Sequence, residues 1–139
     1  MTKSEDTIKT GMKFNKGKLR YSIIPMESVR EVVKVSEYGA IKYEPNNWKN
    51  ITDMDVYYDA LMRHMIAWKT GETHDEESHL HHLAHAAWNA LTLVWFAIQK
   101  GELDPNAPFN LEYLEKWLAE KEKIKAAEKA NQVVYNEAK

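Results

Sequence analysis

Hydrophobic side chains recur with helical spacing in four segments of the chain. These segments are residues 26–43, 53–70, about 75–100 and 111–136. Within each, apolar residues return every three or four positions and so share one side of a helix. Gly71 and Gly101 follow the second and third segments, where a helix commonly ends. The pattern predicts an all-α protein, a helical bundle of about four helices.

The remaining residues divide the chain into three parts. Residues 1–10 are predicted to be a flexible N-terminus, and residues 11–100 to form the helical domain. Residues 101–139 would supply a linker and a C-terminal helix rich in Lys, Glu and Ala. At the start of the helical domain, residues 11–25 combine a glycine turn with a short apolar run that stops at Pro25. This composition predicts an irregular, basic lead-in.

The charge balance excludes some classes of function. Lys plus Arg number 19 against 21 Asp plus Glu, and a net charge of −2 does not favour a protein held to duplex nucleic acid by bulk charge. The chain has no cysteine, which excludes disulfides and thiolate metal ligands and favours a reducing cytoplasm. No apolar run approaches the length of a membrane span or a signal peptide. We therefore expect a soluble, cytoplasmic protein without a membrane partner.

The third predicted helix has two chemically distinct faces. One is apolar and is predicted to form the core: Leu80, Leu83, Ala87, Leu91, Val94 and Ile98. The opposite face carries polar groups: His81, His82, His85, Asn89 and Thr92. Histidines three or four residues apart stack along a helix, so His85 can share one divalent cation with His82 or with His81.

Side chains from other segments would complete such a metal site. Glu31 lies on the polar stripe of the first helix, His64 on the inward face of the second, and Asp75 at the start of the third. Imidazole and carboxylate groups together suit a divalent metal ion in the core of a bundle. An alternative stays open, because a face with several histidines is often solvated. His64 alone is often a core histidine with satisfied hydrogen bonds.

Basic residues cluster around the glycine turn of the lead-in. They are Lys13, Lys16, Lys18 and Arg20. Ammonium and guanidinium groups beside the backbone N–H groups of a tight loop suit phosphate. Lys42 adds positive charge on the same face of the first helix as Glu31. Each lysine can also be solvated without a role, and Trp48 can either stack on a base or close the core.

Four stretches stand together in a particular order and at particular intervals. They are "GMKFNKGKLRYSIIP", "VSEYGAIKYEPNNW", "ALMRHMIAWKTGE" and "DEESHLHHLAHAAWNAL". As a set they resemble the phage-associated dATP/dGTP diphosphohydrolases, a family related to the all-α, MazG-like nucleoside triphosphate pyrophosphohydrolases. The resemblance covers about residues 11–98 and leaves out the C-terminal tail.

The resemblance implies a fold, a cofactor and a reaction. The fold would be a MazG-like helical bundle, usually a dimer or a larger homo-oligomer, with a divalent metal such as magnesium or manganese. The reaction would convert a deoxypurine triphosphate to the monophosphate and pyrophosphate. Metals would clamp the phosphates while a carboxylate-positioned water attacks in line. Glu31 would be the first-helix carboxylate, and the loop with Lys18 and Arg20 would hold phosphate.

The chain departs from the MazG-like pattern in its acids. Better-known members carry an EExxE helix followed by an ExxD helix. Here the first helix offers Glu27 and Glu31, with Lys34 where a third acid is expected. His82 and His85 stand in place of the ExxD acids. Histidine suits manganese, zinc, cobalt or iron better than magnesium.

The leading hypothesis is a metal-dependent hydrolase of purine nucleoside triphosphates. Its predicted catalytic acids are Glu31 and Asp75. Its predicted metal ligands, or their immediate supports, are Glu31, His64, Asp75, His82 and His85. Its predicted substrate contacts are Lys13, Lys18, Arg20, Lys42 and Arg63 for phosphate, with Asn47 and Trp48 near the base.

Two other classes of protein compete with this hypothesis. A non-catalytic nucleotide-binding protein, such as a phage sponge that sequesters a nucleotide immune signal, needs the basic and aromatic pocket without a full set of acids. The missing third carboxylate favours that alternative. A regulatory or scaffold bundle would leave the histidines as a solvated face, and chelators would then leave its melting temperature unchanged.

Overall fold

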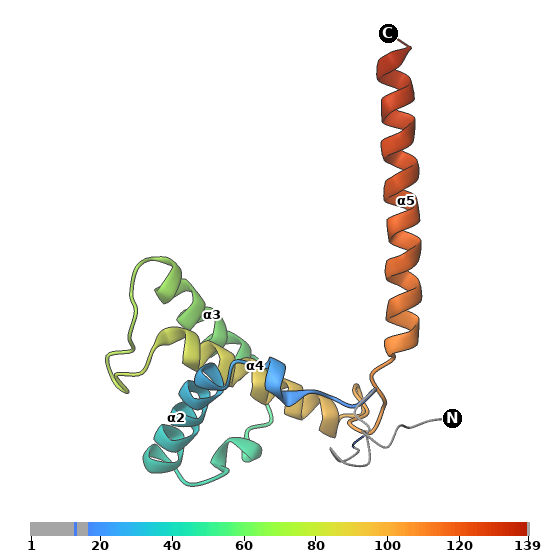
Figure 1. Ribbon diagram of the computed structural model, residues 1–139. Coiled ribbons are helices and arrows are strands. Elements are labelled where there is room, and N and C mark those ends of the chain that lie inside the picture. Colours follow the sequence, from blue (N-terminus) through green and yellow to red (C-terminus); the bar gives the residue numbers. More distant parts are fainter. Residues whose placement is uncertain (1–12, 14–16, 139) are drawn as a thin grey trace. The chain divides into compact units, whose positions relative to one another are not determined.

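A computed structural model describes residue 13 and residues 17–138 of the chain (Figure 1). Its elements are the 3-10 helices η1 (Tyr21–Ile23) and η2 (Asn47–Asn50) and the α-helices α2 (Met26–Lys42), α3 (Asp55–Lys69), α4 (His82–Gln99) and α5 (Leu111–Glu137). The described residues contain no β-strand, only an isolated bridge between His74 and His81. The predicted all-α class is confirmed. Among the helices of the described residues, none is long and apolar enough to cross a membrane.

The chain divides into two units, which are described separately. One unit comprises residues 21–106 and contains α2, α3 and α4. In this unit α2 and α3 both pack against α4. The other unit includes α5 and the described residues up to Arg20. The candidate functional side chains that lie in the 21–106 unit are therefore organised around α4.

Helices α2 and α3 begin and end close to the predicted positions. α2 starts directly after Pro25, whose missing N–H costs nothing at a helix start. Near the start of α3, the Asp53 Oδ1 atom accepts a hydrogen bond from the Asp55 N–H at 3.0 Å. After α3 the chain turns at Gly71, whose φ of 109° favours glycine. Local signals in the sequence therefore set these bounds.

Helix α4 begins later than predicted. The sequence predicts a start near Asp75–Ser78, whereas the helix starts at His82. The intervening residues form a closed loop, in which the His82 N–H donates to the Thr73 carbonyl at 2.9 Å and the Asp75 N–H to that of Leu80 at 2.8 Å. His79 within it has a left-handed φ of 60°, which a continuous helix does not allow.

The two faces of α4 are also reversed with respect to the prediction. The polar side is the inner one, and His82, His85, Asn89 and Thr92 are each only 5–6% exposed. On the side predicted to be core, Leu91 is 62% exposed and Val94 49% exposed. The predicted periodicity is present, but α2 and α3 pack against the histidine side. The prediction that Leu91 and Val94 lie in the core of this unit is wrong.

Helix α5 is long and strongly charged. Its 27 residues match the predicted C-terminal helix closely, and the Asn110 side chain caps it by accepting a hydrogen bond from the Tyr113 N–H at 3.0 Å. None of its described residues is buried. An ion pair between Lys116 and Glu112 at 3.0 Å follows the i, i+4 spacing that supports exposed helices.

A candidate metal centre at one end of a pocket

Three segments of the 21–106 unit bring imidazole and carboxylate groups together. His64 comes from α3, His82 and His85 come from α4, and Asp75 comes from the loop between these helices. One ligand atom from each of His64, Asp75 and His82 lies within 4.8 Å of the others. The Nδ1 atoms of His64 and His82 are 2.9 Å apart, and the ring of His85 stacks on that of His64 at 4.4 Å. This convergence is what the sequence predicts for these four residues.

Asp75 is held in place by the loop that delays α4. Its Oδ2 atom accepts hydrogen bonds from the N–H and hydroxyl of Ser78, at 2.8 and 2.9 Å. The Ser78 Oγ atom is also 2.6 Å from the His85 Nε2 atom, and Asp75 Oδ2 lies 3.9 Å from that nitrogen. Burial opposes ionisation of Asp75, but the hydrogen bonds from Ser78 outweigh it and lower the pKa of the carboxyl. Asp75 is therefore an anion facing the imidazoles.

His64 and His85 are held in the neutral form that ligates metals. Burial lowers the pKa of His64 to about 4, and the neighbouring His85 and His82 rings add to the effect. Burial also lowers the pKa of His85, although Asp75 opposes the change. The Nδ1 atoms of His64 and His82, 2.9 Å apart, can both offer lone pairs to one cation.

The Nε2 atom of His82 is buried and has no hydrogen-bond partner among the described residues. The nearest carboxylate oxygen, Glu72 Oε2, is 3.4 Å away on a side chain that is 67% exposed. A ligating histidine ordinarily uses its second nitrogen on a carboxylate or carbonyl. Close Nδ1 atoms, an anionic Asp75 and a buried ring nitrogen near a carboxylate together fit a divalent cation.

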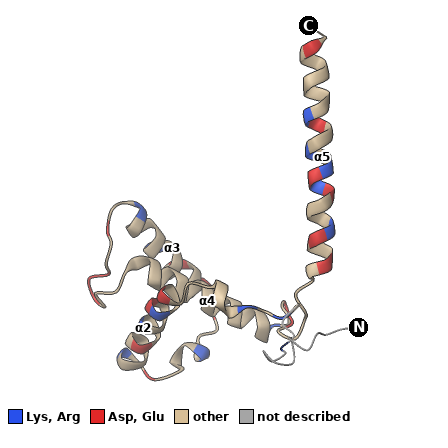
Figure 2. Cartoon of the chain, viewed as in Figure 1, with Lys and Arg blue, Asp and Glu red and all other residues tan. Residues whose placement is uncertain are grey.

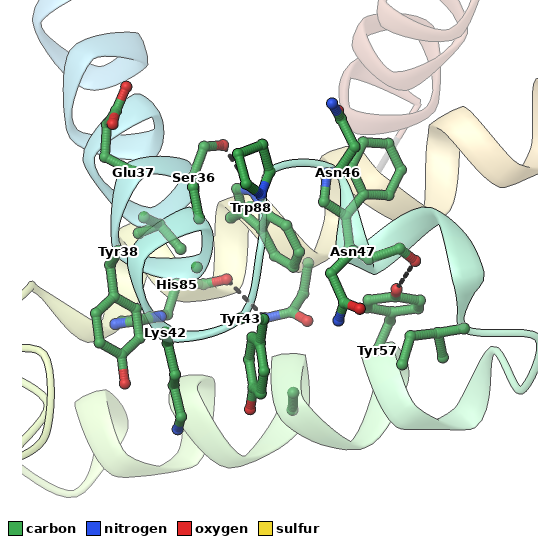
Figure 3. A pocket seen from close by; sticks show the side chains of 18 of the residues that line it. Ser36, Glu37, Tyr38, Lys42, Tyr43, Asn46, Asn47, Tyr57, His85 and Trp88 are labelled. Carbon is green, nitrogen blue, oxygen red and sulfur yellow. Dashed lines mark hydrogen bonds between the residues drawn. The ribbon is translucent and has the colours of Figure 1, made fainter.

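A cavity of about 740 Å³ extends from this group of side chains to the loop after α2. His64, Asp75 and His85 line one part of it, and Asn47 and Trp48 another. Figure 3 shows His85 on the side of Tyr38 and Lys42, and Asn46 and Asn47 on the other side. This volume falls in the usual range for small-molecule sites. Histidine and carboxylate groups thus mark one end of the cavity, and amide and indole groups the other.

Aromatic rings hold the Trp48 end of the cavity. Trp48 makes edge-on contacts with Trp88 and Trp95, at centroid distances of 6.3 and 4.9 Å. The Tyr57 hydroxyl donates a hydrogen bond to the Trp48 carbonyl, which ties η2 to α3. Asn46, just before η2, has a left-handed φ of 63°, a conformation that asparagine adopts more readily than most residues. The loop is therefore fixed in shape where it meets the cavity.

Lys42 lines the same cavity but is already paired. Its Nζ atom donates to Glu77 Oε1 at 2.6 Å, and this contact joins the end of α2 to the loop before α4. The hydrogen bond to Glu77 raises the pKa of Lys42, which therefore stays cationic. The buried hydroxyl of Tyr38 has no hydrogen-bond partner among the described residues, and burial raises the pKa of this phenol. One cation and one hydroxyl donor consequently face the cavity near His85.

The structure does not bring every predicted residue to this place. Glu31 pairs with Lys34 at 2.7 Å, with its side chain 45% exposed, and it does not line the cavity. The hydrogen bond from Lys34 is the main cause that lowers the pKa of Glu31. Arg63 is exposed and does not line the cavity either. His81 leaves the His85 face, because its Nδ1 atom caps α4 by accepting from the Leu83 N–H at 3.0 Å.

The basic residues of the lead-in that the structure describes belong to the other unit of the chain. Lys18 and Arg20 are exposed there, and Lys13 is exposed as well. Lys16 lies outside the described residues. The role of Lys13, Lys18 and Arg20 in phosphate binding therefore stays a prediction.

Sequence reasoning missed several side chains of this region. Ser78 positions Asp75, Glu72 approaches His82, and Tyr38 faces His85 edge-on at 5.9 Å. No spacing rule would have found Glu72 or Tyr38, since each reaches the group through the tertiary fold. The Asp75–Ser78 pair has a local signal, because aspartate followed three residues later by serine can close a turn through its side chain.

Fold and site together define a class: an all-α domain with a histidine–carboxylate group at one end of a small-molecule cavity. A family model described as dATP/dGTP diphosphohydrolase, N-terminal, matches residues 8–106. The chain therefore belongs to this family, and the resemblance found in the sequence is confirmed.

A curated relative supports the family assignment. The relative, a dATP/dGTP diphosphohydrolase of Salmonella phage PMBT28, is 36% identical to the chain over 86 residues. The similar region covers 62% of the chain but only 29% of the relative, so the chain spans less than a third of that protein's length. No solved structure matches the chain significantly.

Proposed function

We propose that the chain is a metal-dependent hydrolase that converts a purine nucleoside triphosphate, with a deoxypurine nucleotide as the first candidate, to the monophosphate and pyrophosphate. The observation that carries the proposal is one continuous cavity with metal-ligating groups at one end and amide and indole groups at the other. The family and the name of the phage relative supply the substrate class.

The proposed metal ligands are His64, Asp75 and His82, with His85 stacked beside them. Imidazoles with a single carboxylate suit manganese, zinc, cobalt or iron better than magnesium. A bound cation would act as a Lewis acid that polarises phosphoryl oxygens and neutralises charge as it develops. Glu31 is not among the proposed ligands, because its carboxylate is paired with Lys34 at the surface.

Residues of the chain would orient the reactants. Water attacks the α-phosphorus and forms the new P–O bond, while the bond from that phosphorus to the bridging oxygen breaks and pyrophosphate leaves. Asp75 Oδ1 accepts no hydrogen bond from the described residues, so it is available to accept one from the attacking water. Because the Ser78 hydroxyl donates to Asp75, the His85 Nε2–H donates to Ser78 Oγ, and neutral His85 would take the proton at Nδ1. Lys42 would pair with the phosphates.

The base would lie at the far end of the cavity. Asn47 offers both a donor and an acceptor to a purine edge, and the Trp48 indole offers a surface for stacking. Lys49 lies over the Trp48 and Trp95 rings, 5.4 and 5.5 Å from their centroids, which concentrates positive charge at this end. The proposed partner is thus a free nucleotide, and duplex nucleic acid is not expected.

A product assay tests the proposal directly. The full chain is incubated with dATP or dGTP and each of magnesium, manganese, zinc and cobalt, and pyrophosphate release is measured with and without a chelator. Turnover should need the metal and should fall at least ~100-fold in Asp75→Asn, which loses a charged ligand. Glu76→Gln, at the neighbouring exposed carboxylate, is the matched control and should keep full activity. An absence of turnover in every combination would rule out hydrolysis.

One observation favours a second candidate, a protein that binds nucleotides without cleaving them. Asp75 is the one carboxylate in the metal-ligating group of the described residues, and Glu31 lies apart from it. A phage protein that sequesters a nucleotide signal needs no further acid. Heat denaturation of a preformed complex separates the two functions, because a sponge returns the nucleotide intact and an enzyme returns products.

The family resemblance also implies a homo-oligomer, and the absence of cysteine favours the reducing cytoplasm as the place of action. We therefore propose that the protein is a homo-oligomer and that it acts in the cytoplasm.

A further inference from the structure

Asn89 is a buried amide in the wall of the cavity. It is only 5% exposed and lines the cavity from α4. Its Nδ2 atom donates to the His85 carbonyl at 2.8 Å, within the same helix. Because a carbonyl can only accept, this bond fixes the amide nitrogen toward the helix and leaves the Oδ1 atom directed away from it. Oδ1 accepts no hydrogen bond from the described residues, and a buried acceptor of this kind ordinarily has a donor, so it indicates a ligand.

Asn89 lies between the two ends of the cavity. Along α4 it is one helical turn beyond His85, which lies at the end with the metal-ligating groups. It also directly follows Trp88, whose ring contacts that of Trp48, at the other end, with a centroid distance of 6.3 Å. In a nucleotide the sugar joins the phosphates to the base. With the phosphates at the histidines and the base at Trp48, the sugar therefore passes Asn89.

Helix α3 leaves room for a sugar beside Asn89. The two helices run antiparallel, because the His64 end of α3 meets the start of α4 and the Tyr57 end meets its later turns. One turn before His64 on α3 is Ala60, which also lines the cavity. Ala60 is thus the α3 residue at the level of Asn89, and its methyl group fills little of the space there.

The wall at this level is uncharged. α4 contains no Lys, Arg, Asp or Glu, and Figure 2 shows it without either charge colour. The residues of α3 that line the cavity include no such residue either. A phosphate would find no cation here, whereas a sugar hydroxyl needs only a neutral acceptor. The middle of the cavity therefore suits the uncharged part of a nucleotide.

Neighbouring polar groups are already bonded to each other. The Ser36 Oγ atom accepts from the Trp88 Nε1–H at 2.8 Å, and the Tyr57 hydroxyl donates to the Trp48 carbonyl. The Asn89 Oδ1 atom is the buried acceptor that remains for a hydroxyl of the ligand.

We propose that Asn89 binds the sugar of the nucleotide, with its Oδ1 atom accepting a hydrogen bond from the 3′-hydroxyl. This inference rests on the proposed function, which sets the phosphates at the histidines and the base at Trp48. In a deoxynucleoside triphosphate the 3′-hydroxyl is the only free hydroxyl of the sugar, so it is the donor that can meet this acceptor. A nucleotide whose 3′-oxygen is esterified lacks the donor and binds less tightly.

Isothermal titration calorimetry of the full chain with manganese tests the proposal. The ligands are the uncleavable α,β-methylene analogues of dATP and dGTP, each compared with its 3′-deoxy counterpart. The parent chain should bind the 3′-hydroxyl form about 10-fold more tightly, because the 3′-deoxy form leaves the buried Oδ1 atom without a donor. Asn89→Leu, which has the same branched shape without polar atoms, should lose this preference. Thr92→Val is the matched control and should keep it, because Thr92 is equally buried on the same side of α4 but does not line the cavity.

The 3′-deoxy analogues also report whether a variant folds. Asn89→Leu should bind them as tightly as the parent chain does, since they make no bond to Oδ1. If Asn89→Leu binds neither form, Asn89→Ala removes the same acceptor with a smaller side chain, and it should bind both forms equally. On the parent chain itself, a 3′-amino analogue restores a donor and should regain the preference, whereas a 3′-fluoro analogue should not.

The outcomes separate this inference from the proposed function. A parent chain that binds both forms equally, or an Asn89 variant that keeps the preference, would overturn the role of Asn89 and leave nucleotide binding intact. Loss of both forms in Asn89→Leu and in Asn89→Ala would show that Asn89 supports the fold rather than the sugar, which also rejects the inference. A parent chain that binds no analogue would overturn the proposed function as well.

Discussion

Acid should destabilise the metal-free protein through its buried histidines. The pKa of His64 is lowered to about 4 from an ordinary value of 6.5, chiefly by burial and then by His85 and His82. The unfolded chain takes up a proton on this residue near pH 6.5, and the folded chain does so only near pH 4. Between these values the unfolded state binds more protons, so the free energy of unfolding falls as the pH is lowered. Above pH 6.5 the effect vanishes, because His64 is neutral in both states.

The size of the effect follows from the two pKa values. The gap between 6.5 and about 4 corresponds to about 3 kcal/mol for one imidazole. His64 is only half-buried, and solvent screening reduces the figure to about 1–2 kcal/mol. In a domain of this size each kcal/mol shifts the melting temperature by roughly 4–8 °C. Between pH 7 and pH 4.5, His64 alone should therefore lower the melting temperature by about 5–15 °C.

Thermal melts followed by far-ultraviolet circular dichroism measure this, with a chelator present throughout. The comparison is between the parent chain, His64→Asn and the control His74→Asn, an exposed histidine bonded to the Thr73 hydroxyl. His64→Asn should flatten the fall in melting temperature below pH 6.5, and His74→Asn should keep it. Parallel curves for the parent chain and His64→Asn would refute the argument that burial keeps this imidazole neutral.

Three further changes test the pocket. Tyr57→Phe removes the hydrogen bond to the Trp48 carbonyl and should lower the free energy of unfolding by about 1 kcal/mol, which is measured as a lower melting temperature. If the loop holds the base, the nucleotide KM should also rise. Lys42→Ala breaks a half-exposed ion pair with Glu77, so the melting temperature should barely move while the nucleotide KM rises severalfold; an unchanged KM contradicts a phosphate role. Manganese at a hundred times its Kd should stabilise the fold by about 2.7 kcal/mol, and a chelator should reverse this; identical melts would contradict a metal site.

Helix positions could be predicted because their signals are local. The apolar spacing of α2 and α3, the start after Pro25 and the stop at Gly71 act within a few residues, and the bounds fall close to those expected. The predicted start of α4 is wrong for an equally local reason. Acidic residues and Ser78 resemble the first turn of a helix, but here the Asp75 side chain closes a separate loop. A helix start and this loop both use the Asp75 side chain as a hydrogen-bond acceptor. Only the longer-range bonds to the Thr73 and Leu80 carbonyls select the loop.

The candidate metal-ligating group could be predicted in part. His82 and His85 share a face because they are three residues apart, and the inward direction of His64 follows from its helix. The position of Glu31 depends instead on how α2 rotates against α4, which no spacing on α2 encodes. Its carboxylate consequently pairs with Lys34, one turn along the same helix.

The reversal of α4 has a physical consequence for the stability of this helix. Periodicity separates the two faces of a helix but does not say which one is inside, and the usual preference would bury Leu91 and Val94. Leaving a leucine or valine in water forgoes about 1.5–3 kcal/mol each, and burying the polar imidazoles brings a cost unless they gain partners. A cation between the histidines would remove the second cost. The arrangement of α4 is therefore more stable with a cation bound, and the metal-loaded chain should melt well above the metal-free chain.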